Sequence, residues 1–260
     1  MLVSNTNALL TVEEMVAADK ATIDSGVEGF TLMRRAGEAC AQALGKRFAR
    51  QPVVVLVGPG NNGGDGFIIA EELRKAQWDV RVGLMGEKNA LKGDAAKAAE
   101  AYKGSIHPLH PFLIDADARL IVDALFGTGL ARPIEGEAAE VLEKIARRKL
   151  PVVAVDIPSG INGNTGEVMG AAAPAALTVT FHRKKRGHVL EPGRSYCGEI
   201  VVADIGILGK AKHGGKNCLE NTPDLWRNAL PLPHAGSHKY TRGHAVVQGG
   251  PLQQTGAARL

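Results

Sequence analysis

The run VVVLV at residues 53–57 constrains the fold of this chain more than any other stretch. It holds only valine and leucine, without a polar interruption, which is typical of a strand buried on both faces of a sheet. The glycine-rich segment GPGNNGGDGF (58–67) follows directly, and Ile69, Leu73 and Ala76 then recur on one side of a predicted helix. A buried strand, a glycine turn and a helix in succession predict an α/β protein with a parallel sheet.

Strands and helices alternate along most of the remaining sequence. Two helices precede the first strand, at 11–26 and about 28–49, and a capping box of Thr11 and Glu14 starts the first of them. This order predicts a three-layer, Rossmann-like α/β sandwich with a mostly parallel sheet, preceded by two N-terminal helices. The further strands are expected at 79–85, 119–125, 150–157, 176–181 and 199–206, and the further helices at about 90–102 and 137–149.

The alternation stops near the end of the chain. Residues 209–235 are rich in glycine, proline and polar residues without periodicity, which predicts a linker. HAVVQGG (244–250) then predicts a strand with a glycine turn, and TGAARL (255–260) the start of a helix. Because these elements are too few to bury a core, we expect a first domain at 1–208 and the truncated start of a second at 236–260.

Composition narrows the class of partner. The formal net charge is only +4 and aromatic residues make up 4%, so nucleic acid is not an expected partner. The N-terminal residues carry neither a signal peptide nor a membrane helix, which predicts a cytoplasmic protein without a membrane partner. Cys40, Cys197 and Cys218 form no CxxC pair, so no disulfide framework is expected, and Cys40 has the spacing of a packing residue.

Three of the predicted strands end in loops rich in polar residues and glycine: GPGNNGGDGF (58–67), VDALFGTGLARPIEG (122–136) and VDIPSGINGNTGEV (155–168). Each loop alone could be an ordinary turn, because Asp, Asn and Gly are common turn formers. Ligands of open parallel sheets, however, bind outside the carboxyl ends of the strands. Three such loops at one edge of a sheet therefore predict a binding site.

The first loop has the spacing of a dinucleotide-binding turn, since Gly58, Gly60 and Gly63 fit G-x-G-x-x-G. The N-terminus of the following helix would suit an anion. Asp65, in that first turn, would repel a phosphate in the usual dehydrogenase position, although it could instead complement the helix dipole. The next strand also ends without the acidic residue that holds a ribose. The sequence favours a phosphate-bearing ligand in another pose over a conventional dehydrogenase site.

The same loops carry oxygen ligands for a cation. Asn62, Asp123 and Ser159 supply an amide oxygen, a carboxylate and a hydroxyl. One carboxylate among neutral oxygens suits a monovalent ion better than Mg²⁺ or Ca²⁺. The histidines are scattered in loops and near the C-terminus, and no catalytic role is expected for them.

The three loops in this order resemble those of the NAD(P)H-hydrate epimerase family, which is also the N-terminal module of the bifunctional bacterial NAD(P)H-hydrate repair enzyme. LMRRAG in the second helix and KKRGHVLEPGRSYCGEIVVADIGI (184–207) extend the resemblance over about residues 10–208. HKYTRGHAVVQGG (238–250) is similar to the opening of the partner module, the ADP-dependent dehydratase. Since most of that module is absent, no dehydratase activity is expected.

The resemblance implies a reaction and its residues. The family interconverts the S and R forms of hydrated NADH and NADPH, which carry a hydroxyl at C6 of the nicotinamide ring. Asp156 matches the family's substrate-contacting aspartate, and Asn62, Asp123 and Ser159 match its potassium ligands. The resemblance further implies that the substrate is bound by Asn61, Asn62, Gly63, Gly64, Asp65, Gly127, Thr128, Gly129, Leu130, Ala131, Arg132 and Pro133.

A strand-end aspartate suits this chemistry, because inversion at C6 through a ring-opened or dehydrated intermediate requires proton transfer. Asp156 is therefore the predicted general acid/base, and its alternative role is to hold the turn at 156–160. Lys184, Lys185 and Arg132 are candidate phosphate partners. The competing function is a non-catalytic nucleotide-binding module that regulates or scaffolds a partner. A homodimer is a candidate assembly, since dimers are common for such folds.

Overall fold

The computed structural model describes residues 7–115, 117–208, 218–230, 232, 234–238, 240, 243–249 and 251. The chain divides into two compact units. One comprises Ser4–Glu220 and holds the sheet with its helices, and the other includes the described residues from Asn221 onward. The larger unit carries every candidate site residue predicted from the sequence.

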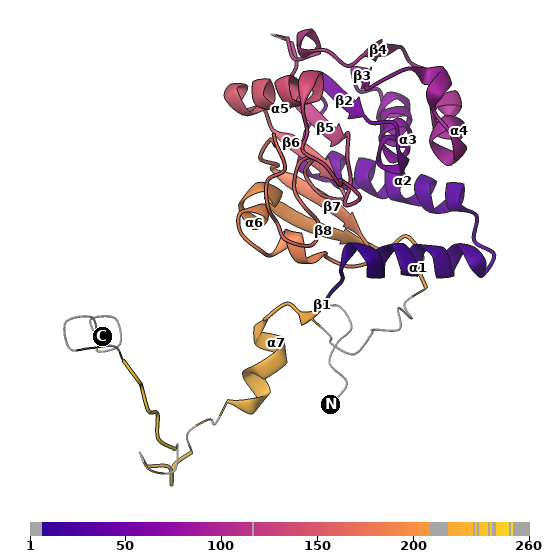
Figure 1. Ribbon diagram of the computed structural model, residues 1–260. Helices are drawn as coiled ribbons and strands as arrows, with labels where there is room; N and C mark the ends of the chain where they lie inside the picture. Colours follow the sequence, from indigo (N-terminus) through magenta and orange to yellow (C-terminus); the bar gives the residue numbers. More distant parts are fainter. Residues whose placement is uncertain are drawn as a thin grey trace. The chain divides into compact units, whose positions relative to one another are not determined.

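Seven parallel strands form the central sheet of the larger unit, in the order β4-β3-β2-β5-β6-β7-β8 (Figure 1). After β2 the chain adds β3 and β4 on one side of this strand, and it then returns to add β5 to β8 on the other side. The helices that follow β2 and β5 therefore lie on opposite faces of the sheet, which makes a crevice at its carboxyl edge. The strands are β2 (Val53–Val57), β3 (Val80–Leu84), β4 (Ile106–Pro108), β5 (Leu120–Ala124), β6 (Val152–Val155), β7 (Leu177–Phe181) and β8 (Glu199–Ala203).

Helices cover both faces of the sheet, so the predicted three-layer sandwich is confirmed (Figure 1). Strand β2 shows why: Val53, Val55 and Val57 pack into one core cluster with helices α2–α4, while Val54 and Leu56 pack into the other with α5. All five side chains are fully buried, as their unbroken apolar run predicts. The helices are α1 (Val12–Asp24), α2 (Gly29–Arg47), α3 (Asn61–Lys75), α4 (Gly93–Ala101), α5 (Gly136–Arg148) and the short α6 (Gly193–Cys197).

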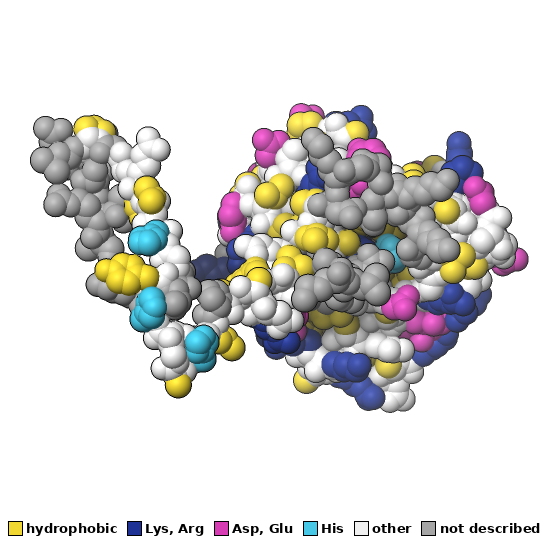
Figure 2. Space-filling model, turned by 90° about the horizontal axis from the view of Figure 1, so that it is seen from below, with side chains coloured by type: hydrophobic (Ala, Val, Ile, Leu, Met, Phe, Trp, Pro, Cys, Tyr) yellow, Lys and Arg dark blue, Asp and Glu magenta, His cyan; other side chains and the backbone are white. Residues whose placement is uncertain are grey.

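The N-terminal helices match their sequence signals. The Thr11 side chain accepts a hydrogen bond from the Glu14 backbone, and the Glu14 carboxylate accepts one from Thr11 N, so the capping box is present. Cys40 of α2 is buried in the core, as its spacing predicts. On the face of the larger unit seen in Figure 2, acidic and basic side chains are interspersed.

The predicted linker contains residues that belong to the larger unit. Strand β9 (Cys218–Leu219) pairs antiparallel with β1 (Ala8–Leu9), and Glu220 N donates to Asn7 O. Glu220 also forms an ion pair with Lys184, with 2.9 Å between Nζ and Oε2. The boundary between the two units consequently falls after Glu220 instead of at residue 208.

The described residues after Asn221 hold little regular structure. They form the one-turn helix α7 (Pro223–Trp226) and a 3₁₀ turn, η5 (Arg227–Ala229). The strand expected over 244–250 is not formed in its described part, 244–249, where Val246 and Val247 are exposed. The helix expected over 255–260 lies outside the described residues. Within the part of the chain that the structure describes, none of the helices is long and apolar enough to cross a membrane.

Candidate active site

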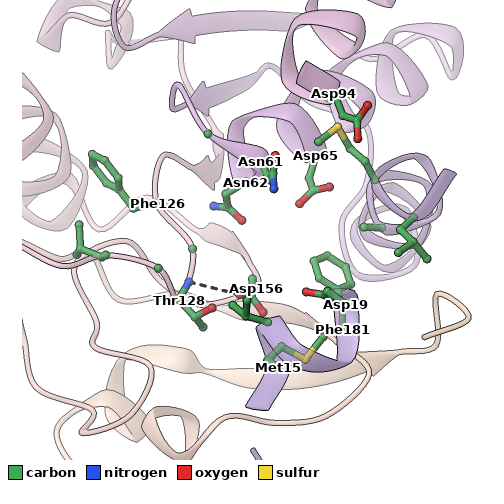
Figure 3. A pocket seen from close by; sticks show the side chains of 18 of the residues that line it. Met15, Asp19, Asn61, Asn62, Asp65, Asp94, Phe126, Thr128, Asp156 and Phe181 are labelled. Carbon is green, nitrogen blue, oxygen red and sulfur yellow. Dashed lines mark hydrogen bonds between the residues drawn. The ribbon is translucent and has the colours of Figure 1, made fainter. Parts of the chain in front are cut away.

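A cavity of about 690 Å³ opens at the carboxyl edge of the sheet, where the sequence predicts a site (Figure 3). Its size falls in the range of small-molecule and cofactor sites. The loops after β2, β5 and β6 all contribute to its wall, together with α1 and α2. Of the predicted substrate-binding residues, the cavity is lined by Asn61, Asn62, Asp65, Gly127, Thr128, Gly129, Leu130, Ala131, Arg132 and Asp156.

Gly63, Gly64 and Pro133 are not among the residues that line the cavity. The two glycines are buried, and a Cβ on Gly63 would come within 1.8 Å of the Gly58 carbonyl oxygen. A Cβ on Gly58 would in turn lie 1.9 Å from the Leu125 carbonyl oxygen, in the loop after β5. Gly63 thus lets the first loop fold closely on itself, and Gly58 lets this loop approach the loop after β5, which are packing roles.

Asp123 and Ser159 meet beneath the cavity, and both are completely buried. Ser159 Oγ donates to Asp123 Oδ1 at 2.6 Å, and Ser159 N donates to Asp123 Oδ2 at 2.8 Å. The same hydroxyl lies 3.2 Å from the Phe126 carbonyl oxygen, an oxygen that residue-type patterns cannot identify. Burial raises the pKa of Asp123, although hydrogen bonds from Ser159 and Leu125 oppose this. Two of the three predicted cation ligands are therefore in direct contact.

Asn62, the third predicted ligand, lies next to Gly127, the residue that follows Phe126 in the loop after β5. A Cβ on Gly127 would be 3.3 Å from Asn62 Oδ1 and 3.5 Å from Asp156 Oδ2, so the amide and the carboxylate flank Gly127. The Asn62 Nδ2 atom is buried without a hydrogen-bond partner. Among the described residues, no group of three or more His, Cys, Asp or Glu side chains could hold a metal ion.

Asp156 directly follows β6 and has a left-handed backbone conformation, with a φ of 65°. Its carboxylate accepts from Thr180 Oγ1 at 2.9 Å, from Lys185 Nζ at 2.5 Å and, through Oδ2, from Thr128 N at 3.4 Å. Burial alone would raise its pKa, but the charge and hydrogen bond of Lys185, with His188 and Thr180, outweigh this and lower the pKa to about 2. Asp156 is thus held as a carboxylate facing the cavity.

Lys184 and Lys185, the two lysines predicted as phosphate partners, have different surroundings in the structure. Lys185 is only 1% exposed and lines the cavity, where its ammonium group contacts Asp156 and, at 2.9 Å, Thr180 Oγ1. Lys184 is instead paired with Glu220 and is not a lining residue. The strict alternation of side chains along an extended segment separates neighbours in this way. The sequence identified Lys185, as a phosphate partner, and Asp156, as the acid/base, but it did not predict that the two pair.

His188 connects the two charged residues through their backbones. Its Nδ1 accepts from Lys185 N at 2.9 Å, so Nε2 is the nitrogen that carries the proton and donates to Asp156 O at 2.7 Å. Burial, reinforced by the charge of Lys185, lowers the pKa of His188 to about 4. A neutral imidazole therefore ties the loop after β6 to the loop after β7.

Asp19, Asp65 and Asp94 also line the cavity that Asp156 faces (Figure 3). Burial, followed by repulsion from Asp156 and Asp19, raises the pKa of Asp65 well above its usual value. Burial also raises the pKa of Asp19 to about 6; the charge of Lys185 opposes this rise, and a smaller repulsion from Asp156 adds to it. Asp19 belongs to α1, outside every loop motif, so no sequence pattern identified it. The same cavity thus holds a strongly acidic carboxyl group, that of Asp156, beside those of Asp19 and Asp65, which retain their protons more readily.

Helices α1 and α2 give the cavity an apolar wall opposite these polar groups. Val16 and Ile23 are 60% and 46% exposed, although they occupy the apolar stripe of α1. Their exposure is explained by the cavity, since both line it. A wall of this kind suits the flat ring of a ligand whose other groups are polar. Met15 of α1 and Leu32, Met33 and Ala36 of α2 belong to the same wall, and Phe181 of β7 with Ile205 and Ile207 after β8 add further apolar lining.

The fold and the cavity define a Rossmann-like α/β protein with a ligand site where its strand order reverses. The chain belongs to the family described as YjeF-related protein N-terminus, whose pattern matches residues 29–187. In structure it is similar to the yeast protein ynu0, with a TM-score of 0.60 and 23% identity over 70% of this chain and 83% of that chain. That likeness supports the fold.

Curated relatives fall into two groups by length. The chain is 40% identical to the NAD(P)H-hydrate epimerase of Limosilactobacillus fermentum over 76% of this chain and 97% of the relative. It is 39% identical to that of Rhodobacter capsulatus, over 78% and 97%. It is 37% identical to the bifunctional NAD(P)H-hydrate repair enzyme of Coxiella burnetii over 93% of this chain. The chain spans about half the length of that bifunctional relative, namely 50%.

Proposed function

We propose that this chain is an NAD(P)H-hydrate epimerase, an isomerase that interconverts the S and R forms of hydrated NADH and NADPH. The observation that carries the proposal is the position of Asp156, whose carboxylate faces a cavity lined by Asn61, Asn62 and the loop after β5. Relatives that the chain covers almost completely bear the name of this activity. A hydrated nicotinamide dinucleotide has both the anionic groups and the flat rings that such a cavity suits.

Different residues of the cavity would bind the phosphates, the ribose and the rings of the substrate. The N-terminus of α3, which begins at Asn61, and the side chain of Arg132 suit the phosphates. The loop Gly127–Arg132 offers backbone groups to the ribose and ring, and the apolar wall of α1 and α2 suits a planar base. Gly63, Gly64 and Pro133 remain proposed binding residues that act by shaping these loops.

Potassium is the proposed cation, and the donor set fits it. Asp123, Ser159 and the Phe126 carbonyl offer oxygens within contact of one another, with a single carboxylate charge. The amide oxygen of Asn62 on the adjoining loop lies beside Gly127, the residue after Phe126, which supports its assignment to the same site. When bound, the ion would supply positive charge that fixes the loops after β5 and β6 and offsets the carboxylates near an anionic substrate.

Asp156 is the proposed base. Its Oδ2 atom, which receives only the long 3.4 Å contact from Thr128 N, can accept the proton of the C6 hydroxyl, and its low pKa keeps it ionised at neutral pH. Loss of that proton opens the ring between C6 and N1, and closure on the opposite face gives the other epimer. Thr180 and Thr128 hold the carboxylate in place through hydrogen bonds while the substrate reacts. A cytoplasmic location and a homodimer remain predictions.

A direct test follows the equilibration of purified S- or R-NADH hydrate by chromatography. The chain should accelerate equilibration, and Asp156→Asn should abolish most of that acceleration. A protein that binds the hydrates without equilibrating them would instead be the non-catalytic binding module. Equal rates for the wild-type protein and Asp156→Asn would remove Asp156 from its assigned role.

A further inference from the structure

We propose that Lys185 is the second catalytic residue of this site, and that it donates and takes back the proton of the nicotinamide ring nitrogen while Asp156 handles the proton of the C6 hydroxyl. The inference rests on the proposed function and deepens it. It adds a residue that the sequence motifs around Asp156 do not contain, since Lys185 follows a different strand.

Geometry provides the first support. Lys185 Nζ lies 2.5 Å from Asp156 Oδ1 and 2.9 Å from Thr180 Oγ1, while its side chain lines the cavity. The carboxylate's other oxygen is bound only by the weak 3.4 Å contact from Thr128 N. A donor and an acceptor therefore stand side by side, as the nitrogen and hydroxyl oxygen do on C6 of the substrate.

The backbone holds this lysine in one place. Lys185 N donates to His188 Nδ1, and the flanking peptides bond to Leu10, the residue after β1: Leu10 N donates to Lys184 O, and Arg186 N donates to Leu10 O. Such support on both sides fixes the direction of the side chain. A catalytic group requires this kind of preorganisation, whereas a lysine that merely solvates a surface does not.

Charge balance provides the second support. A fully buried lysine is rare unless it is paired, and Lys185 with Asp156 forms a neutral couple. If Asp156 gains a proton and Lys185 loses one, the couple is still neutral. A reaction that moves a proton from oxygen to nitrogen of the substrate therefore changes no net charge in the buried site, so its electrostatic cost is small.

The step balances without an added reactant. Asp156 accepts the hydroxyl proton, the C6–O bond becomes a carbonyl, the C6–N1 bond breaks, and the electron pair left on N1 takes a proton from the Lys185 ammonium. After the C6 carbonyl rotates, N1 attacks its other face. Lys185 then recovers its proton from N1, and Asp156 returns its proton to the oxygen. The products are the epimer and the original ion pair.

The competing role is purely electrostatic: Lys185 could hold Asp156 in position by charge alone. Arginine distinguishes the two roles, because its guanidinium keeps the charge but does not release a proton in proteins. The Lys185→Arg protein should therefore keep the positioning of Asp156 by charge but lose the proton transfer. Lys184→Arg and Lys184→Met serve as matched controls, since this neighbour is paired with Glu220 away from the cavity.

The experiment measures kcat and KM for NADH-hydrate epimerisation, with NADP binding and thermal unfolding as checks of the fold. We expect Lys185→Met and Lys185→Arg each to lose about 10²- to 10⁴-fold in kcat with little change in KM, as for a lost general acid. The Lys184 variants should stay near the wild-type rate. If Lys185→Arg keeps a tenth or more of the wild-type kcat, the proposal is overturned.

A second measurement covers the case in which arginine does not fit and the variant unfolds. Lys185→Ala is assayed with increasing methylamine, a small amine that can replace the missing donor. A rate that rises with methylamine supports the proposal, and a rate that methylamine leaves unchanged overturns it. Failure of the proposed function would look different, because the wild-type protein itself would then not equilibrate the hydrates.

Discussion

Lys185 Nζ and Asp156 Oδ1 lie 2.5 Å apart although the residues are 29 positions apart in the sequence and follow different strands. The pair is nearly inaccessible to solvent, with side-chain exposures of 1% and 14%. It lies at the wall of the cavity, where both groups can also face a ligand. The stability and the chemistry of this site are consequently linked through a single ion pair.

Asp156→Asn should reduce kcat by about 10²- to 10⁴-fold because the amide cannot accept the hydroxyl proton. It should also lower the free energy of unfolding by about 3–5 kcal/mol, since it leaves the charge of Lys185 buried without a partner. Denaturant titration and the epimerisation assay measure the two effects. Asp24→Asn, in an exposed ion pair with Lys20, is the control and should alter stability by less than about 1 kcal/mol. A stable, inactive Asp156→Asn protein would contradict the predicted loss of unfolding free energy but not the predicted loss of kcat.

The stability of the wild-type protein should depend on pH through Asp156. Its pKa falls from 3.8 to about 2 on folding, so its contribution is present above pH 4 and is lost as pH falls from about 4 to 2. A shift of this size corresponds to about 2 kcal/mol. Unfolding free energies measured from pH 6 downwards should show this loss, and Asp156→Asn should lack it. Parallel curves for the two proteins would argue against a depressed pKa.

Asp19 should make substrate binding sensitive to pH. Its pKa of about 6 means that it gains a negative charge as pH rises from 5 to 7. About 1 kcal/mol of added repulsion would raise KM roughly fivefold over that interval. NADH hydrate is the substrate of choice, because its diphosphate does not titrate there. Asp19→Asn should show a flat KM, and an unchanged pH slope in that variant would assign the effect to another group.

Potassium should stabilise the folded protein if Asp123 and Ser159 help to bind it. Ligands that bind only the native state raise the unfolding free energy by about 2.7 kcal/mol at 100 times their Kd. The melting temperature should therefore be higher in potassium chloride than in choline chloride at equal ionic strength. Asp123→Asn, which removes the only carboxylate of this donor set, should abolish the difference. A wild-type melting temperature that is the same in both salts would contradict the proposed cation.

Gly63→Ala should prevent stable folding, because its Cβ would come within 1.8 Å of the Gly58 carbonyl oxygen. A clash of this severity is among the few changes that cost more than about 4 kcal/mol. Gly60→Ala in the same loop is the matched control, since its Cβ would meet nothing within 4 Å. We expect the control to cost at most about 1 kcal/mol at this N-cap position. Chemical denaturation compares the two, and similar stabilities would contradict the packing role of Gly63.

The structure confirms the strands whose sequence is apolar throughout, because burial on both faces leaves no alternative for residues such as Val53–Val57. The short edge strand Ile106–Pro108 was not predicted. Its side chains are partly or fully exposed, and an edge strand is defined by hydrogen bonds to its neighbour rather than by its own residues. The same reason explains β1 and β9, two-residue strands that exist only through each other.

The amino-acid sequence by itself determined the alternating sheet and helices, the glycine turns and the three loops at one sheet edge, because each depends on residues close together in the chain. Only the tertiary structure decided that Lys185 faces Asp156, that Asp19 joins the cavity from α1, and that the Phe126 carbonyl lies beside Asp123 and Ser159. These relationships join distant segments, and a carbonyl oxygen is present at every residue. Periodicity and motif spacing contain neither kind of information, whereas the packing of the sheet and its helices fixes both.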